Sequence, residues 1–323
     1  MIRSLFLLLI LLISNEIVCQ PNPNYVSLNS LRKHLTIIAS DDMEGRETGT
    51  KGLQRAASYI QKEFKDIGLT TLNHSKGLNQ WYKIPKRLKK VCNVIGCIEG
   101  SSKKDEFIVI SAHYDHLGMV NGDIYNGADD NGSGTSALIS LAEAIMLKKI
   151  NGNPPQRTIV FIAFSGEEKG LWGSRYFTSH PLIPLEKISC NINMDMIGRV
   201  DPDRLLADSL NYIHVVGENR VSSEIKPIIN SLNNSKYKMT LDSKYNDEND
   251  ANRIFYRSDH YNFARKKVPI MFFFDGMLGG DYHETTDDVD KINWNLYYKR
   301  VNFIYDLCEI IDNKEEMLKR DIK

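Results

Sequence analysis

The sequence predicts an α/β protein, a three-layer sandwich in which helices flank a mixed, largely parallel central sheet. Short apolar runs typical of buried strands alternate along the chain with segments whose apolar residues recur at helical spacing. The 323 residues, 42% of them hydrophobic, allow one large α/β domain or two small ones and exclude a largely disordered chain. Lys and Arg together number 41 and so do Asp and Glu, which gives no support for nucleic-acid binding or a basic membrane-binding patch.

Residues 1–19 are predicted to be a secretory signal peptide. Arg3 precedes a run of nine apolar residues, far fewer than the ~20 that a membrane-spanning helix needs. Cleavage after this segment would leave residues 20–323 as an exported protein, periplasmic or extracellular, with no membrane span. A lipid anchor at Cys19 is the less favoured alternative.

The first predicted helix covers residues 51–67, because Leu53, Ile60 and Phe64 share a helical face and Gly68 provides a C-terminal stop. The same periodicity predicts further helices at 133–149, 221–233 and 293–312. Strands are predicted at the apolar runs 91–98, 107–112, 158–164, 188–194, 211–216 and 268–274. Two polar segments without periodicity are expected to be exposed, 236–253 and 313–323.

The cysteines of the predicted mature chain are expected to be free and buried: Cys92, Cys97, Cys190 and Cys308. Cys92 and Cys97 lie on one predicted strand an odd number of residues apart, so their side chains face opposite sides of it. Cysteines this sparse do not form a disulfide scaffold.

Polar groups stand beside several of the predicted strands: His113–Asp115, Asp129–Gly134, Ser165–Glu168, Asp195 and Tyr282–Glu284. Ligands of α/β sheets bind at the carboxyl ends of the strands, so these groups are expected to meet there. Taken alone, most have a structural explanation, such as helix capping by Asp129 or surface charge at Glu167. Asp195 is harder to explain, because a carboxylate within an apolar strand is costly unless it is paired or binds a metal.

Taken together, the groups predict a metal site. Two histidines, His113 and His283, combined with carboxylate oxygens suit a borderline cation such as zinc. The carboxylates exceed what one tetrahedral site needs, which indicates two metal ions that share a bridging carboxylate.

The chain also resembles a known family, the co-catalytic zinc aminopeptidases, which includes secreted bacterial leucyl aminopeptidases and glutamate carboxypeptidase. The resembling segments, within residues 35 to 310, are DDMEGRETGTKG, SAHYDHLG, NGADDNGSG, FSGEEKGLWGS, NMDMIG and YHETTDD. The resemblance implies a zinc exopeptidase-like fold and peptide substrates. Only about 40 residues separate the first predicted helix from the strand at residue 107, too few for the protease-associated domain that members often carry. Residues 20–323 are therefore expected to form a single catalytic domain.

The resemblance also implies a ligand set for two zinc ions. His113 and Asp195 would bind one ion, and Glu168 and His283 would bind the other. Asp129 would bridge both ions, and the peptide bond that follows it would be cis. No ligand of the family's motifs is missing from this sequence.

Further residues are implied to act around the metals. Glu167 would be the general base, which takes a proton from the attacking water and passes it to the leaving amine. Asp115 would hold the far nitrogen of His113 and fix its tautomer. Tyr256 is the nearest candidate for a tyrosine that supports the oxyanion in some members. Residues near the motifs are interpreted as lining or supporting groups: His116, Asp130, Trp172 and Asp287.

An aminopeptidase that removes N-terminal residues from peptides is the favoured function. The alternatives are a carboxypeptidase or dipeptidase of the same family, a glutaminyl cyclase with the same fold but one zinc ion, and a non-catalytic binding ectodomain. The complete ligand set and the Glu167–Glu168 pair favour hydrolysis. Metal stoichiometry would separate the peptidase from the cyclase.

Overall fold

The computed structural model describes residues 25–72, 75–84, 89–204, 208 and 210–322. The predicted signal peptide and Cys19 lie outside these residues. No helix in the described ranges is long and apolar enough to cross a membrane.

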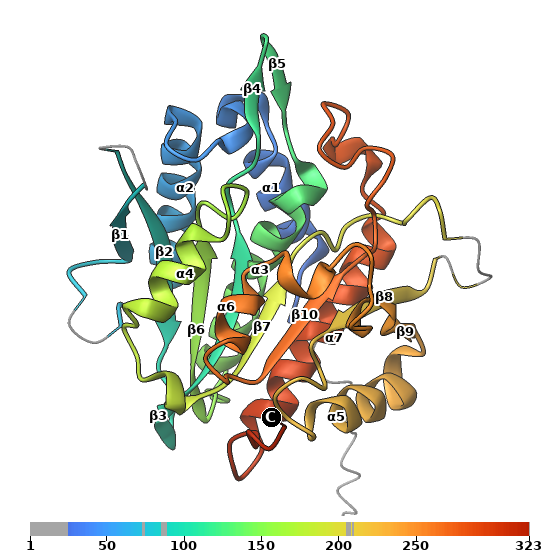
Figure 1. Ribbon diagram of the computed structural model, residues 1–323. Helices are drawn as coiled ribbons and strands as arrows, with labels where there is room; N and C mark the ends of the chain where they lie inside the picture. The colour runs from blue at the N-terminus through green and yellow to red at the C-terminus, as the bar shows by residue number, and fades with distance from the viewer. Residues whose placement is uncertain (1–24, 73–74, 85–88, 205–207, 209, 323) are drawn as a thin grey trace, which may run out of the picture.

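The central sheet has eight strands in the order β1-β2-β6-β3-β7-β10-β8-β9 (Figure 1). Their bounds are β1 (Asn79–Lys83), β2 (Lys90–Ile98), β3 (Lys103–His113), β6 (Arg157–Phe164), β7 (Ile188–Met194), β8 (Tyr212–Val216), β9 (Thr240–Asp242) and β10 (Ile270–Phe274). Four neighbouring strands, β6, β3, β7 and β10, run parallel to one another. β2 is antiparallel to β1 and β6, and β8 is antiparallel to β10. The predicted mixed, largely parallel sheet is thus confirmed.

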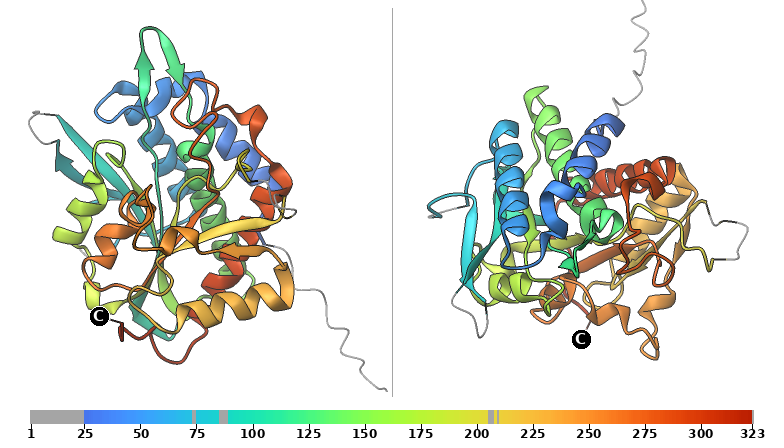
Figure 2. Two further views of the ribbon diagram at one scale, coloured as in Figure 1. Left: turned by 45° about the vertical axis from the view of Figure 1, so that its right-hand side comes forward. Right: turned by 90° about the horizontal axis from the view of Figure 1, so that it is seen from above.

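Helices cover both faces of the sheet (Figures 1 and 2). One layer contains α1 (Leu28–Ile38), α2 (Lys51–Ile67), α3 (Gly134–Ile150), α5 (Ile225–Leu232) and α7 (Trp294–Asp312). The other face carries the short helices α4 (Trp172–Ser179) and α6 (His260–Ala264). Alternation along β3 explains both cores, because Ile108 and Ile110 face the first layer while Val109 packs in the cluster of Phe177 and Phe263.

Shorter elements complete the description. A hairpin of β4 (Gly118–Val120) and β5 (Asp123–Tyr125) projects from the end of the molecule at which the parallel strands finish (Figure 1). Short helical segments lie at Asp41–Arg46, Ala128–Ser133, Leu185–Lys187, Asn233–Tyr237, Lys244–Asn246, Ile254–Tyr256 and Val289–Lys291.

Local signals explain where the best-predicted helix begins and ends. The Thr50 side chain accepts a hydrogen bond from the Leu53 amide at the start of α2. Gly68 ends the helix in the left-handed conformation, at a φ of 92°. The four cysteines are free and buried, as expected: Cys92, Cys97, Cys190 and Cys308.

The two segments expected to be exposed are only partly so. Residues 236–253 contain β9 and the buried Tyr245, whose ring lies 4.8 Å from the His214 ring. In the C-terminal tail, Leu318 is buried and its amide donates to the Ser189 hydroxyl. A few apolar side chains therefore anchor segments whose average composition is polar.

Candidate metal centre

The parallel strands bring the predicted polar groups to one end of the sheet. His113 is the last residue of β3, and Asp195 follows β7 directly. Glu167 and Glu168 lie in the loop after β6, and His283 lies in the loop after β10. Residues up to 170 positions apart along the chain meet because β6, β3, β7 and β10 lie side by side in the sheet.

Asp130 lies at the middle of this group, between His113 at the end of β3 and His283 in the loop after β10. Its Oδ1 lies 3.4 Å from Nε2 of His113, and its Oδ2 lies 3.1 Å from Nε2 of His283. The residue expected in this position was Asp129, so that assignment is wrong in this structure. The cis peptide bond joins Asp130 to Asn131, one residue later than expected.

Asp129 faces away because hydrogen bonds fix its segment on both sides. Its Oδ1 accepts from the Gly198 amide at 2.8 Å. The Asp287 carboxylate accepts from the amides of both Asp129 and Asp130 at 3.0 Å. Burial, together with the neighbouring Asp275, raises the pKa of Asp129 well above its usual range. Asp129 thus belongs to the packing beneath the cluster.

The first half of the cluster consists of His113, Asp130 and Asp195. Nε2 of His113 lies 3.0 Å from Oδ1 of Asp195, and the donor atoms of the three residues lie within 4.8 Å of one another. On its other side, Nδ1 of His113 lies 3.1 Å from the backbone carbonyl oxygen of Asp115 and 3.8 Å from its Oδ1. Asp115 is therefore next to the far nitrogen, as predicted, but its carbonyl group is closer than its carboxylate.

The Asp115 carboxylate has another role in the structure. It accepts hydrogen bonds from the Thr48 hydroxyl at 2.7 Å and from the Glu167 amide at 3.1 Å. Asp115 thereby fixes the start of the Glu167–Glu168 loop as well as the His113 ring.

The second half of the cluster is built around Glu168. Its Oε2 lies 3.4 Å from Nε2 of His283, and its Oε1 lies 3.1 Å from Nδ1 of His116. Donor atoms of His116, Asp130 and Glu168 lie within 4.8 Å of one another. His116 was interpreted as a supporting or lining residue, and the structure places it among the possible ligands. Its spacing, three residues after His113 in the motif HYDH, is the sequence signal for it.

The electrostatics of the cluster fit bound cations. Asp130, Asp195 and Glu168 stand close together without a lysine or arginine ion pair in the ranges that the structure covers. Nε2 of His116, which is fully buried, has no hydrogen-bond partner among the described residues. Burial and the nearby Asp195 raise the pKa of Glu167 well above its usual range, although His113 opposes the shift. Imidazole nitrogens combined with carboxylate oxygens are the donor set that zinc accepts.

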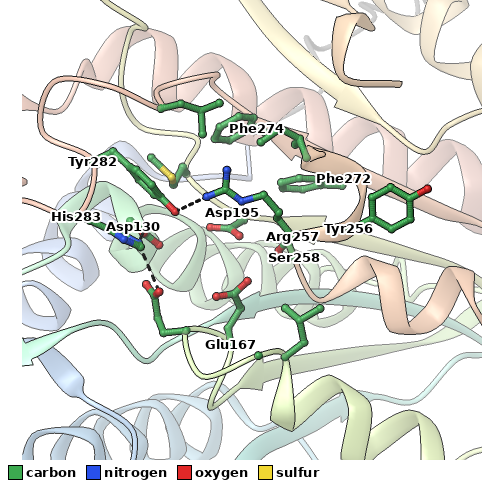
Figure 3. Close-up of a pocket in the computed structure, with 16 residues that line it drawn as sticks. Asp130, Glu167, Asp195, Tyr256, Arg257, Ser258, Phe272, Phe274, Tyr282 and His283 are labelled. Atoms are coloured by element: carbon green, nitrogen blue, oxygen red, sulfur yellow. Dashed lines mark hydrogen bonds and ion pairs between the residues drawn. The ribbon is translucent and has the colours of Figure 1, made fainter. Parts of the chain in front are cut away.

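A cavity of about 310 Å³ opens onto the cluster (Figure 3). Its polar wall includes Asp130, Glu167, Glu168, Asp195 and His283. Its apolar wall comes from other elements, and it includes Met196, Ile254, Phe272, Phe274 and Leu278. Glu167 therefore faces a space that could hold a peptide end beside the cluster.

Tyr256 lines the same cavity, but its ring points away from Glu167 and Asp195 (Figure 3). Its ring contacts are with Phe255 and Tyr261, and 41% of the residue is exposed. The geometry lends no support to an oxyanion role for Tyr256, which stays a prediction. The neighbouring Arg257 extends instead toward Tyr282, which belongs to the predicted group Tyr282–Glu284, whereas sequence reasoning assigned no functional role to Arg257.

The chain is similar to a known protein family over most of its length. The model of the family described as Peptidase family M28 matches residues 93–307. The probable leucine aminopeptidase of Arthroderma otae is 26% identical over 196 residues, which cover 59% of this chain and 50% of that protein. The chain spans about half, or less, of the curated relatives it matches.

Solved structures share the fold. A leucine aminopeptidase precursor from Bacteroides thetaiotaomicron has a TM-score of 0.68 at 18% identity and covers 90% of this chain and 98% of that one. The glutaminyl cyclase from the same organism has a TM-score of 0.69 at 18% identity and covers 90% and 99%. The two neighbours have the same architecture but are named for different activities, so the site itself must decide the function.

Proposed function

Because the chain belongs to peptidase family M28, we propose that it is a zinc-dependent exopeptidase and that it acts as an aminopeptidase. The observation that carries this proposal is the position of the Asp130 carboxylate, between two histidine–carboxylate groups and on the wall of the cavity that Glu167 also lines. The similarity to the probable leucine aminopeptidase of Arthroderma otae supports cleavage from the N-terminal end of the peptide. The glutaminyl cyclase alternative has weaker support, because the shared fold alone favours it.

We propose a zinc ligand set in which Asp130 replaces the Asp129 that the family resemblance implied. His113 and Asp195 would hold one zinc ion, Glu168 and His283 would hold the second, and Asp130 would bridge them. His116 lies as close to Glu168 as His283 does, and it either supports that carboxylate or contributes to the second site. When bound, the metal pair would supply Lewis acidity, which lowers the pKa of a water molecule and polarises the scissile carbonyl.

Glu167 would then act as the general base and acid. It lies next to a proposed ligand in the sequence and lines the cavity, so its carboxylate can receive the proton of the attacking water. The same group would deliver that proton to the leaving amine. Asp115 would position Glu167, since its carboxylate accepts the Glu167 amide hydrogen.

We further propose that residues 20–323 act as one exported catalytic domain. The proposal rests on the apolar segment that follows Arg3 and on the short connection between α2 and β3. N-terminal sequencing of the protein from the culture medium or periplasm would test it, with Gln20 as the expected first residue.

The activity is tested by mapping the products of a mixed peptide pool by mass spectrometry, with and without a chelator. Stepwise loss of N-terminal residues that the chelator abolishes and zinc restores is the expected result. Loss of residues from the carboxyl end would show that the enzyme is a carboxypeptidase and not an aminopeptidase. Formation of pyroglutamate without cleavage would instead favour a cyclase.

A further inference from the structure

Arg257 occupies a distinctive place in the cavity described above. Of the 16 residues that line the cavity, Arg257 is the one with a permanent positive charge. Its side chain extends toward Tyr282 and donates a hydrogen bond from Nη2 to the Tyr282 hydroxyl at 2.9 Å (Figure 3). The residue is exposed, so its remaining N–H groups are open to the cavity and solvent.

The charge of Arg257 has no carboxylate partner in the described ranges. Its guanidinium instead contacts the neutral hydroxyl of Tyr282 and lies 5.8 Å from the centre of the ring of the same residue. Arg199 and Arg220, by contrast, each have a carboxylate partner, since Arg199 lies 2.6 Å from Asp281 and Arg220 lies 3.0 Å from Glu248. An unpaired guanidinium on a cavity wall is a ready site for an anion, because its fork of N–H groups matches a carboxylate.

Tyr282 connects Arg257 to the proposed metal centre. The Tyr282 ring stacks on the His283 ring, with centroids 3.9 Å apart and an interplanar angle of 22°. This stacking holds the phenol, and through it the guanidinium, next to a proposed zinc ligand. The cavity, at about 310 Å³, is at the small end of the roughly 300–1,000 Å³ typical of small-molecule sites. It suits a short peptide better than a long chain.

We propose that Arg257 is a specificity residue that binds a carboxylate on the leaving-group side of the substrate, and that the enzyme therefore prefers short peptides with an acidic end. The inference rests on the proposed peptidase function and names its substrate class. The carboxylate can come from the free C-terminus of a dipeptide or from an acidic side chain that follows the scissile bond. Either source offers the same two oxygens to the guanidinium.

Three substrates separate the sources: leucyl-glutamine, leucyl-glutamine amide and leucyl-glutamate amide. The first has a free C-terminal carboxylate, the third has only a side-chain carboxylate, and the second has neither. We expect kcat/KM for one or both acidic substrates to exceed that of the neutral amide by about tenfold or more, mainly through KM. The ratio of kcat/KM for an acidic substrate to kcat/KM for the neutral amide should fall as the salt concentration rises from about 0.05 to 0.5 M, because salt screens exposed charges.

Arg257→Gln should bring the ratio close to one, while Arg257→Lys should keep part of it, since it retains the charge but not the fork. Tyr282→Phe should lower the ratio less than Arg257→Gln, because it removes only the hydroxyl that orients the guanidinium. The matched control is Arg253→Gln, because Arg253 is also exposed and lies over the Tyr256 ring, outside the cavity lining. This control should keep the wild-type ratio.

Equal cleavage of all three substrates by the wild type, or an unchanged ratio in Arg257→Gln, would overturn the role of Arg257 and leave the peptidase proposal intact. No cleavage of any substrate by the zinc-loaded wild type would overturn both. Equal losses in Arg257→Gln and Arg253→Gln would indicate a general effect of surface charge and would also overturn the assignment.

Discussion

Two clusters in this molecule contain the same kinds of residue and differ in how their charges are balanced. The first is the metal centre around Asp130. The second, called here the His34 cluster, consists of His34, Glu63 and Glu143, which belong to α1, α2 and α3. In each, a buried histidine and two carboxylates bring donor atoms within 4.8 Å of one another.

The His34 cluster is satisfied by its own neighbours. Nδ1 of His34 lies 2.6 Å from the Tyr59 hydroxyl, and its Nε2 lies 3.1 Å from Oε1 of Glu143. Lys33 forms a 2.9 Å ion pair with Glu63. Its histidine and carboxylates therefore already have partners, and a cation would have to displace them.

The Asp130 centre lacks such partners. Its carboxylates face histidines and one another, with no lysine or arginine ion pair in the described ranges, and a buried nitrogen of His116 is left without a hydrogen bond there. The comparison teaches that residue types alone do not predict a metal site. Stronger evidence for a metal site comes from buried histidine and carboxylate atoms that lack partners in the protein and that lie at the carboxyl ends of parallel strands.

Among substitutions that compare the two clusters, Glu167→Gln is expected to have the largest effect, which is a loss of kcat. The amide cannot take a proton from water, so kcat should fall by about 10²–10⁴-fold while zinc content stays at the wild-type level. Cleavage of leucyl-glutamine amide and elemental analysis of the same sample measure both quantities. Glu63→Gln, in the His34 cluster, is the matched control and should keep the wild-type kcat. Wild-type activity in Glu167→Gln would mean that another group is the base.

The next largest expected difference is in bound zinc, between Asp130→Asn and Asp129→Asn. Asp130 faces both halves of the centre, so its substitution should reduce bound zinc from the proposed two ions to one or fewer per chain. Asp129 is turned toward Gly198, so Asp129→Asn should keep two ions. Dialysed samples measured by mass spectrometry of the metals would decide. Loss of zinc in Asp129→Asn alone would restore the assignment that the sequence favoured.

This pair of residues marks the limit of what the sequence could predict about the site. The motif GADDN placed two adjacent acids at the centre, and their spacing alone does not tell which one turns inward. That choice depends on Asp287, 157 residues after Asp130, whose carboxylate accepts both backbone amides. Arg257 likewise has no carboxylate partner because no acidic side chain from another described loop lies close enough. A single sequence does not show such distances.

The fold was more predictable because its signals are local. Apolar runs such as 107–112 and 158–164 are strands in the structure, within β3 and β6, and Gly68 ends α2 as predicted. The short α4 and α6 were not predicted, since eight and five residues are too few for a clear helical period. Tertiary packing of Phe177 and Phe263 against the sheet explains why they are nevertheless helical.

A smaller effect is expected when the His34 cluster is broken. Glu143→Gln removes the carboxylate that lies beside His34 and accepts from the Ser30 hydroxyl. Zinc content should stay unchanged, and the free energy of unfolding should fall by about 1–2 kcal/mol. Urea unfolding and metal analysis of the same preparation measure the two quantities. Loss of one zinc ion from Glu143→Gln would show that the His34 cluster binds metal after all.

The smallest expected effect is the pH dependence of that stabilisation. Burial would raise the pKa of Glu143, but hydrogen bonds from His34 and Ser30 outweigh it, and the pKa is lowered from its ordinary value of 4.5. The unfolded chain therefore binds the proton more readily, so the stability that Glu143 contributes is present above about pH 4.5 and is lost as the pH falls through the lowered pKa.

Unfolding of the chelator-treated protein at pH 7, 5 and 4 would measure this contribution apart from metal loss. The wild type should be more stable than Glu143→Gln at pH 7, and the difference should shrink toward pH 4, because Glu143 of the unfolded chain takes up a proton below about pH 4.5. A difference that grew toward pH 4 would mean that the protonated form of Glu143 is the stabilising one. The His34 cluster would then owe its stability to a shared proton instead of to the charge balance that distinguishes it from the Asp130 centre.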